Sequence, residues 1–404
     1  MKILQINTVY KEKSTGRTCY EVEQELNRLG HKCVTAYGVG KHKKSTNIYK
    51  IDTRIEYEMH NILSRVTGLE GFFSIFATIR LIKFIKKFSP DVIHLRNLHG
   101  HYLNLPILFR FLKKNDYPIL QNLHDMWAIT GKCCYYTSYN CDKWQVGCCQ
   151  CPAKKKYPIS YFFDFSRFMW KKKKEWYSRL KNLSVVGVSK WVSEEAEKSY
   201  LKQCKSISYI YNWVNMDIFK PSYIFEETKK KYNIPNNKKV ILGVSAFWSE
   251  GTPRVVDFKK LATILKDDEV IVMVGRKDCV LPDGVIHIPF TSSTQELALL
   301  YSMATVYVHC SIEDTFGKVI AEAQACGTPA IVYDSTGCKE IVVDGISGYV
   351  VEPRNVDRIR EKIDLIKLNG KEAYINNCVE NVMNRFSYKK NMVQLIEVYN
   401  NVCK

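Results

Sequence analysis

Short apolar runs alternate with helix-like patterns along most of the chain, and this alternation restricts the fold more than any other feature. In the first half the apolar runs lie at residues 2–7, 33–37, 92–95, 119–123 and 185–188, with helical patterns at 19–29, 72–88 and 103–112. In the second half they lie at 240–244, 270–274, near 286, 306–309 and 330–333, with helical patterns at 257–265, 295–302 and 316–326. Strands that alternate with helices form parallel, doubly wound sheets. The sequence therefore predicts an α/β protein with two Rossmann-like domains.

The boundary between these domains falls where both periodicities stop. Residues 211–222, YNWVNMDIFKPS, fit neither a strand nor a helix and end in Lys-Pro before the pattern restarts. We therefore predict a first domain at 1–211 and a second at 212–385. The tail at 355–402 reads as three helices with no strand between them, and we expect its end, residues 386–404, to pack back on the first domain.

Charge is distributed unevenly between the two halves. Of 404 residues, 46% are hydrophobic and 25% charged, which excludes collagen, coiled coils and disordered tails. Residues 1–210 hold 36 Lys and Arg against 17 Asp and Glu, whereas the remainder holds 24 of each sign. Such segregated charge attracts polyanions, whether nucleic acid, anionic lipid headgroups or a lipid-linked pyrophosphate.

No stretch approaches the ~18–20 consecutive apolar residues that a membrane-spanning helix needs. The opening MKIL continues into Gln5 without an apolar signal region. We therefore expect a cytoplasmic protein.

The most informative stretch for chemistry is residues 311–329, SIEDTFGKVIAEAQACGTP. Asp314 and Glu322 are eight positions apart, so both carboxylates face one side if Asp314 precedes the first helical turn. Thr315, Phe316 and Gly317 then offer backbone amides at a helix N-terminus, which binds anions such as a nucleoside diphosphate. In the alternative interpretation Asp314 only caps the helix and Glu322 lies in solvent.

The run at residues 313–329 resembles the nucleotide-sugar motif of retaining GT-B glycosyltransferases of the family 4 type, related to glycogen and sucrose synthases. In that family a Glu, seven residues and a second Glu precede Ala-x-Ala-Cys-Gly-x-Pro, and the matching residues here are Ala323, Ala325, Cys326, Gly327 and Pro329. The resemblance implies two Rossmann-like domains with parallel sheets facing across a cleft. It also implies that Asp314, in place of the usual Glu, binds sugar hydroxyls, with Glu313 as the alternative, and that Glu322 binds the ribose.

The family also places basic residues after the first strand of its second domain, to neutralise the leaving diphosphate. Arg254 is the basic residue of that segment, and Phe247 stands where many relatives have an Arg. Arg276, after the next strand, is expected to supply a second charge. The alternative is that both arginines are simply solvated.

Candidate residues of the first domain follow its strands, where open sheets bind ligands. By resemblance, His124 faces the donor sugar and His99 lies on the acceptor side, although a structural role for either is the alternative. Gly16 lies in a predicted loop at 11–17 that resembles the glycine-bearing loop near the diphosphate. Lys11 and Lys13 stand where relatives often carry glycines.

Six of the fifteen cysteines lie within residues 133–151. Cys148-x-x-Cys151 is a usual metal half-site, and Cys133 and Cys141 complete a four-thiolate set for a structural zinc ion. Buried unligated thiols or disulfides are the alternative. The block at 124–152 also resembles a subgroup used in colanic acid and O-antigen assembly, and we expect the insertion at about 130–152 to be structural.

Together these features predict a hexosyltransferase that uses a GDP- or UDP-linked sugar, with no catalytic metal. The expected acceptor is an undecaprenyl-pyrophosphate-linked oligosaccharide, and retention of anomeric configuration is implied by the resemblance. Aromatic and basic residues at 72–88 and 161–176 favour a peripheral position at the anionic inner membrane surface over a core helix and a solvated face. The rival interpretations are a zinc-containing nucleic-acid-binding protein and a sugar-nucleotide epimerase.

Overall fold

The computed structural model describes residues 1–43 and 45–403 and divides the chain into two compact units. The first unit comprises Met1–Ile210 and the end of the chain from Gln394, and the second comprises Tyr211–Val393. The change of unit at residue 211 coincides with the start of the predicted linker. The chain returns to the first unit inside helix α13 (Tyr388–Val402), later than residue 386, where the sequence placed the boundary.

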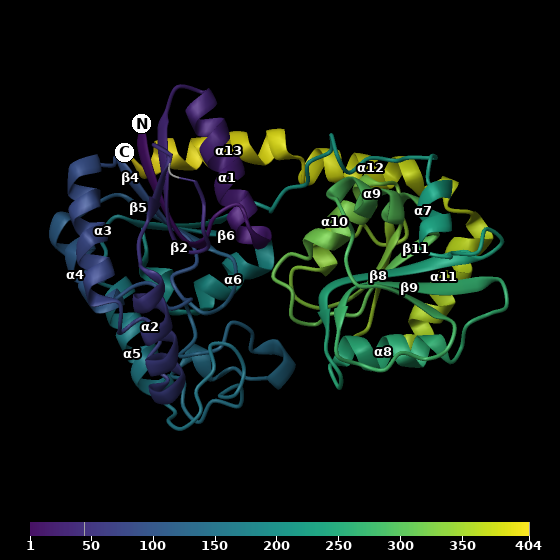
Figure 1. The fold of residues 1–404 in the computed structure, drawn as a ribbon, viewed down its shortest axis with the longest axis horizontal. Coiled ribbons are helices and arrows are strands. Elements are labelled where there is room, and N and C mark those ends of the chain that lie inside the picture. Colours follow the sequence, from purple (N-terminus) through teal and green to yellow (C-terminus); the bar gives the residue numbers. More distant parts are fainter. Residues whose placement is uncertain (44, 404) are drawn as a thin grey trace. The chain divides into compact units, whose positions relative to one another are not determined.

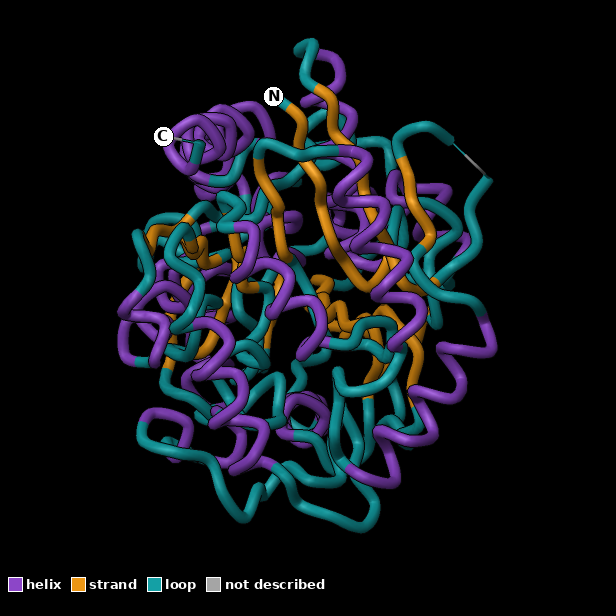
Figure 2. The backbone as a smooth tube through the Cα atoms, turned by 90° about the vertical axis from the view of Figure 1, so that its left-hand side faces the viewer, coloured by secondary structure: helices purple, strands orange, loops and turns teal. Residues whose placement is uncertain are grey.

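Within the described residues, the first unit is built on a seven-stranded parallel sheet of order β3-β2-β1-β4-β5-β6-β7. Strands run side by side between helices in Figure 2. The strands are β1 (Lys2–Val9), β2 (Lys32–Val39), β3 (Ile48–Lys50), β4 (Val92–Leu95), β5 (Ile119–Leu123), β6 (Leu183–Gly187) and β7 (Ser206–Tyr209). Central strands β4, β5 and β6 are buried along their whole length, which explains their continuous apolar runs.

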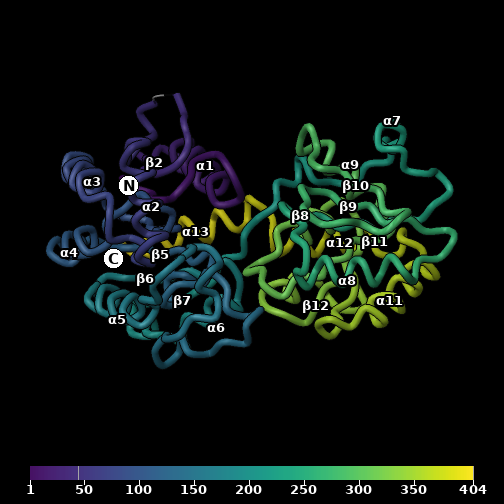
Figure 3. Tube along the Cα trace, turned by 60° about the horizontal axis from the view of Figure 1, so that its bottom comes forward, coloured from purple at the N-terminus to yellow at the C-terminus, as the bar shows by residue number. Residues whose placement is uncertain are grey.

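Helices of the first unit cover this sheet, and α3 and α4 lie side by side (Figures 1 and 3). The α-helices before the domain change are α1 (Lys13–Arg28), α2 (Arg54–Thr67), α3 (Ile75–Phe88), α4 (Leu105–Asn115), α5 (Ser166–Tyr177) and α6 (Lys190–Lys198). Short 3-10 turns are η1 (Thr137–Tyr139), η2 (Lys143–Gln145) and η3 (Tyr200–Gln203). Helix α1 begins well before residue 19, where the sequence placed it, so most of the predicted loop at 11–17 is helical.

Helix α2 was not predicted, although both of its ends carry recognisable signals. Thr53 accepts a hydrogen bond from the backbone of Glu56, whose carboxylate accepts one from the backbone of Thr53, and the two form a capping box. Gly68 ends the helix in the left-handed conformation with φ of 79°. Exposed apolar residues along α2 obscure the periodicity by which a core-facing helix is recognised.

The tail helix α13 docks on the first unit through a buried polar contact. Tyr399 is fully buried, and its hydroxyl lies 2.6 Å from Nδ1 of His94 on β4.

The second unit contains a six-stranded parallel sheet of order β10-β9-β8-β11-β12-β13 within the described residues. Its strands are β8 (Lys239–Trp248), β9 (Glu269–Lys277), β10 (Val285–Ile288), β11 (Val306–His309), β12 (Ala330–Tyr333) and β13 (Gly348–Val351). Its helices are α7 (Glu226–Lys231), α8 (Pro253–Ala262), α9 (Thr294–Met303), α10 (Lys318–Ala325), η4 (Lys339–Ile341), α11 (Val356–Asn369) and α12 (Glu372–Arg385). Helices α8 and α11 cover one face and α9, α10 and α12 the other (Figure 1).

The core of this unit lies between the sheet and the α8–α11 pair. Phe258 of α8 and Ile363 of α11 pack with Ile271 of β9 in one buried apolar cluster. Burial of such side chains contributes roughly 1.5–3 kcal/mol each. This packing holds the carboxyl ends of β8 and β11, from which the candidate site extends. No helix among the described residues is both long and apolar enough to cross a membrane.

Candidate functional site

The loop between β11 and α10 is longer than predicted, because the helix that follows it begins later in the chain. Helix α10 begins at Lys318 instead of residue 316, and Gly317 is its N-cap with φ of 78°. The interpretation that Asp314 caps this helix is therefore wrong. The left-handed φ of Gly317 favours glycine, whereas a Cβ atom there would meet only the flexible end of the Ile320 side chain at 2.6 Å. Phe316 is buried and packs against Phe386.

Asp314 lies in this loop and pairs with the last residue of β11. Its Oδ2 atom is 2.8 Å from Nε2 of His309, and its side chain is 35% exposed. Burial favours a higher pKa for this carboxyl, but the hydrogen bond from His309 and the positive charges of His309 and Arg254 hold its pKa below the ordinary value. Asp314 is therefore ionised at neutral pH and partly accessible, as a ligand of sugar hydroxyls has to be.

Glu322 lies on the inner side of α10 and is 7% exposed. The interpretation of Glu322 as a solvated surface residue is therefore wrong. The hydroxyl of Tyr301 lies 3.4 Å from Oε2 of Glu322. Burial raises the pKa of Tyr307, and the negative charges of Asp314 and Glu322 raise it further. Both carboxylates therefore act on the same tyrosine.

Arg254, in the first turn of α8, joins two strand ends. Its guanidinium donates to Ser245 Oγ on β8 at 2.6 Å and to Ser311 Oγ after β11 at 3.1 Å. Arg254 therefore has hydrogen-bonding partners that fix its position near Asp314, and the interpretation of a freely solvated side chain is wrong.

Arg276 differs from Arg254 in its surroundings. It is exposed near the end of β9, opposite Phe247 in the register, and within the described chain it forms no ion pair.

Lys318, the first residue of α10, was not singled out from the sequence. A cation at a helix N-terminus is unfavourable for the helix itself, and this local conflict is the signal that points to an anionic ligand.

In the first unit the structure brings His99, His124 and Asp125 together where β4 and β5 end. Nε2 of His99 lies 2.8 Å from Oδ2 of Asp125, and Nδ1 of His99 lies 3.0 Å from the hydroxyl of Tyr157. All three residues line one small cavity together with Arg96. Burial and the charge of Arg96 hold the pKa of His124 well below its ordinary value, so its imidazole is neutral at neutral pH.

Gly16 lies inside α1, which corrects its predicted place in a loop. A Cβ atom there would lie 3.1 Å from Val9 Cγ2, and the Gly16 carbonyl accepts a hydrogen bond from the Lys11 amide at 3.0 Å. Lys11 and Lys13 have φ of 61° and 54°, a conformation that favours glycine. Both lysines therefore hold a backbone conformation in which glycine would be less strained.

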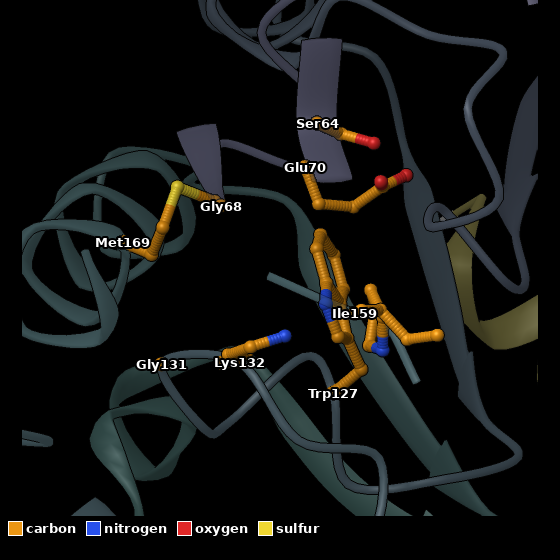
Figure 4. Close-up of a pocket in the computed structure, with 9 residues that line it drawn as sticks. Ser64, Gly68, Glu70, Trp127, Gly131, Lys132, Ile159 and Met169 are labelled. Atoms are coloured by element: carbon orange, nitrogen blue, oxygen red, sulfur yellow. The ribbon is translucent and has the colours of Figure 1, made fainter. Parts of the chain in front are cut away.

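A second cavity of the first unit lies beside the cysteine-rich insertion (Figure 4). Glu70, Trp127 and Lys132 are among its lining residues, and the Lys132 side chain points toward the Trp127 ring. Glu70 accepts hydrogen bonds from the amides of Gly100 and His101. A cation, a carboxylate and an indole thus surround one polar space.

The four predicted metal-ligating thiols, Cys133, Cys141, Cys148 and Cys151, line a single cavity in this insertion. None of these cysteines forms a disulfide. Lys173, in a lysine run that reads as solvated, is fully buried instead and donates to the carbonyls of Trp127 and Thr130 at 2.6 and 3.1 Å. It therefore holds the segment that precedes the cysteines.

Comparison with known families accounts for both units. The pattern of Glycosyltransferase Family 4 matches residues 15–218, and that of Glycosyl transferases group 1 matches residues 224–381. Since the first match alone spans half of the chain, the chain belongs to glycosyltransferase family 4, as the motif at 313–329 indicated.

Two curated relatives cover part of the chain. It is 27% identical over 205 residues to the N,N'-diacetylbacillosaminyl-diphospho-undecaprenol alpha-1,3-N-acetylgalactosaminyltransferase of Campylobacter jejuni, covering 47% of this chain and 53% of that protein. It is 28% identical over 170 residues to WcaC of Escherichia coli, a protein named for colanic acid biosynthesis, covering 39% and 41%. The chain thus spans about half the length of the curated relatives that it matches.

Solved structures match over nearly the full length. Sucrose-phosphate synthase of Thermosynechococcus elongatus gives a TM-score of 0.71 at 16% identity, covering 100% of this chain and 99% of that one. HepE of Anabaena in complex with UDP gives 0.68 at 15%, covering 99% and 100%. The predicted GT-B class, with two parallel α/β units, is therefore confirmed.

Proposed function

We propose that this chain is a glycosyltransferase that moves a hexose from a nucleoside diphosphate sugar to a hydroxyl of an undecaprenyl-pyrophosphate-linked oligosaccharide, with retention of anomeric configuration. The observation that carries the proposal is the arrangement of Asp314, Glu322 and Arg254 around the start of α10. It supplies two carboxylates for hydroxyl groups and a positive environment for a diphosphate. GDP-linked sugars are our first choice of donor and UDP-linked sugars our second.

The donor diphosphate is expected to bind at the amino end of α10. The backbone amides in the first turn of α10, the helix dipole and the Arg254 guanidinium all favour an anion there. The Lys318 ammonium adds a second positive charge. Glu322 then accepts hydrogen bonds from the ribose, and Asp314 accepts them from the sugar.

The reaction requires no metal ion in this proposal. The bond between the anomeric carbon and the diphosphate oxygen breaks while the acceptor oxygen bonds to the same face of the sugar. The acceptor proton passes to the departing diphosphate. Arg254, Lys318 and the helix amides stabilise the negative charge that develops on this leaving group.

We assign the acceptor to the first unit, where His99 and Asp125 lie at the ends of β4 and β5, the edge at which open sheets bind ligands. The Campylobacter relative is named for a diphospho-undecaprenol acceptor, which supports a lipid-linked acceptor here. WcaC supports a place in surface polysaccharide assembly, such as colanic acid or O-antigen.

A membrane-docking face further supports a lipid-linked acceptor. Ile55, Met59 and Ile62 of α2 are 72%, 58% and 61% exposed, and Phe76 of α3 is 72% exposed. The exposed large apolar residues of this face, which we name the α2 face, are Ile55, Met59, Ile62, Leu63, Val66, Ile75, Phe76, Ile79, Tyr161, Phe162, Phe163, Phe165 and Phe168.

Its parts are joined by direct contacts. The Tyr161 amide donates to the Arg65 carbonyl at 2.8 Å, and Nδ1 of His60 lies 2.7 Å from the Ser74 hydroxyl. Exposed Lys155, Lys156 and Arg167 flank the aromatic segment. An apolar face bordered by cations fits an anionic bilayer, so we place the protein peripherally at the inner face of the cell membrane.

The decisive experiment first screens UDP- and GDP-linked sugars by thermal shift. The stabilising donor is then incubated with an undecaprenyl-pyrophosphate-linked oligosaccharide. We expect a product heavier by one hexose, with the donor's anomeric configuration. Donor conversion without an acceptor would instead identify an epimerase. Salt-sensitive binding to duplex DNA with no nucleotide-sugar binding would identify a nucleic-acid-binding protein.

A further inference from the structure

The cysteine-rich insertion places five thiols around one small space, and four of them are the predicted metal ligands. Cys133, Cys141, Cys148 and Cys151 come from a short segment and line a cavity of about 10 Å³, roughly the space of one water-sized sphere. Trp144, which is 1% exposed, and Tyr136, which is 9% exposed, form part of its wall. A tetrahedral zinc ion needs four sulfur ligands at ~2.3 Å in a closed environment of this kind.

The surrounding groups suit thiolates. The Gly131 amide lies 3.1 Å from Cys148 Sγ and donates to it, as amides beside metal thiolates do. Lys143 donates to the carbonyls of Cys149 and Gln150, so it supports the turn between Cys148 and Cys151. Four thiolates and one Zn²⁺ carry a net charge of about −2, which favours nearby cations.

Two buried lysines lie beside these thiols. Lys132 is 7% exposed and lines the same cavity. Lys173 is fully buried and donates to the carbonyls of Trp127 and Thr130, so it fixes the segment that precedes the cysteines.

The other two cysteines of the insertion have different surroundings. Cys134 is buried, and its sulfur lies within 4.8 Å of ligand atoms of both His99 and Asp125. Cys149 lines the same cavity as the proposed ligands but is exposed, whereas the other cysteines that line it are buried or half-buried. Cys134 lies outside the cavity lining and Cys149 faces solvent, so neither is assigned as a ligand.

We propose that Cys133, Cys141, Cys148 and Cys151 bind one structural zinc ion. Among the described residues, no three of these sulfurs lie within 4.8 Å of one another, whereas sulfurs of a tetrahedral zinc centre are ~3.8 Å apart. Binding therefore draws the parts of the insertion inward. Lys132 lines both this cavity and the cavity of Figure 4, and the amide of neighbouring Gly131 donates to Cys148, so the metal fixes the loop that presents Lys132.

The test measures zinc in protein purified with a phosphine reductant and without chelators. Wild-type protein is expected to hold about one equivalent, and Cys148→Ser/Cys151→Ser less than about a tenth of that. Cys149→Ser is the matched control and should retain the full equivalent. Less than half an equivalent in wild type, or full zinc in the double variant, overturns the proposal.

Cobalt provides a second readout that does not depend on whether the double variant folds. Co²⁺ added to reduced, metal-free wild type should produce thiolate-to-metal absorption and intense visible bands of tetrahedral Co²⁺, and Zn²⁺ should abolish both. Absence of these bands, or mass-spectrometric detection of disulfides among the four cysteines of freshly purified protein, overturns the proposal. Neither measurement uses a donor or acceptor, so its result is independent of the proposed transferase activity.

Discussion

Oδ2 of Asp314 and Nε2 of His309 lie 2.8 Å apart at the end of the central strand β11. The histidine is 6% exposed in its side chain, whereas the carboxylate is 35% exposed, so the pair points from the core toward solvent. Nδ1 of His309 lies 3.1 Å from the hydroxyl of Tyr307. Buried groups therefore orient Asp314, and its accessible oxygen is available to a ligand.

Asp314→Asn should remove the charged acceptor for sugar hydroxyls while preserving the shape of the side chain. We expect the transfer rate to fall by ~10²-fold, because the lost hydrogen bonds strengthen as the sugar becomes positively charged. The affinity for the free nucleoside diphosphate should change by less than ~3-fold. The neighbouring Glu313→Gln is the control and should leave transfer near the wild-type rate; an equal loss in both variants would contradict the role assigned to Asp314.

Glu322→Gln should weaken binding of the nucleoside diphosphate, whereas Asp314→Asn mainly slows transfer. Loss of a charged acceptor for the ribose hydroxyls is worth ~1.5–3 kcal/mol, so the dissociation constant of the nucleoside diphosphate should rise ~10- to 150-fold. Isothermal titration calorimetry measures this effect directly. Exposed Glu352 of the same unit provides the control Glu352→Gln, which should bind normally. Wild-type affinity in Glu322→Gln would remove this residue from the donor site.

The sequence predicted the bounds of several buried strands, although it missed β13, which is mostly buried and begins with glycine. Strands β4, β5, β11 and β12 have the predicted bounds, because strands buried on both faces appear as continuous apolar runs. The sheet-edge strand β7 is mostly exposed and reads SISY, which gives no apolar run. Edge strands of this kind depend on pairing with a neighbour, which no local pattern records.

The same distinction applies to the candidate site. Asp314 and Glu322 could be found because their spacing along one loop and helix is local. The contact between His99 and Asp125 joins the ends of separate strands, and the burial of Lys173 depends on carbonyls more than forty residues away. Such long-range partners require the folded sheet before they can be recognised.

The α2 face should control binding to anionic membranes. Met59→Glu/Ile62→Glu adds two negative charges and removes two exposed apolar groups, so partitioning onto phosphatidylglycerol vesicles should fall by at least ~10-fold. Co-sedimentation with vesicles measures the bound fraction. Leu368→Glu alters a residue of the second unit that is 82% exposed and should leave binding unchanged. Similar binding by the double variant and wild type would exclude this face.

Acid should destabilise the contact between α2 and the start of α3 through His60. Burial lowers the pKa of His60 to about 4 from 6.5, despite the opposing charge of Glu70. The unfolded chain therefore takes up the proton first, and stability that is complete above pH 6.5 is lost as the pH falls toward 4. This pKa shift corresponds to at most about 3 kcal/mol of the free energy of unfolding.

His60→Gln cannot titrate, and its amide oxygen can still accept the hydrogen bond from Gly71 that His60 Nε2 accepts at 3.2 Å. The melting temperature of the variant should therefore fall less steeply than that of wild type between pH 6.5 and 4. Thermal unfolding at half-unit pH steps provides the comparison. Parallel curves for the two proteins would show that His60 does not account for the acid sensitivity.

Tyr399→Phe should weaken the docking of α13 on the first unit. The hydroxyl of Tyr399 contacts Nδ1 of His94 at 2.6 Å inside the core, and Phe leaves that nitrogen buried without its partner. An unsatisfied buried polar atom costs about 1–3 kcal/mol, so the free energy of unfolding in urea should decrease by that amount. Tyr223→Phe, at a residue that is 76% exposed, should change it by less than about 0.5 kcal/mol. Helix α13 leaves the second unit and ends on the first, so increased proteolysis within residues 394–403 of Tyr399→Phe would locate the loss of stability at this contact. Unchanged stability and unchanged resistance to proteolysis would show that apolar packing alone holds the helix.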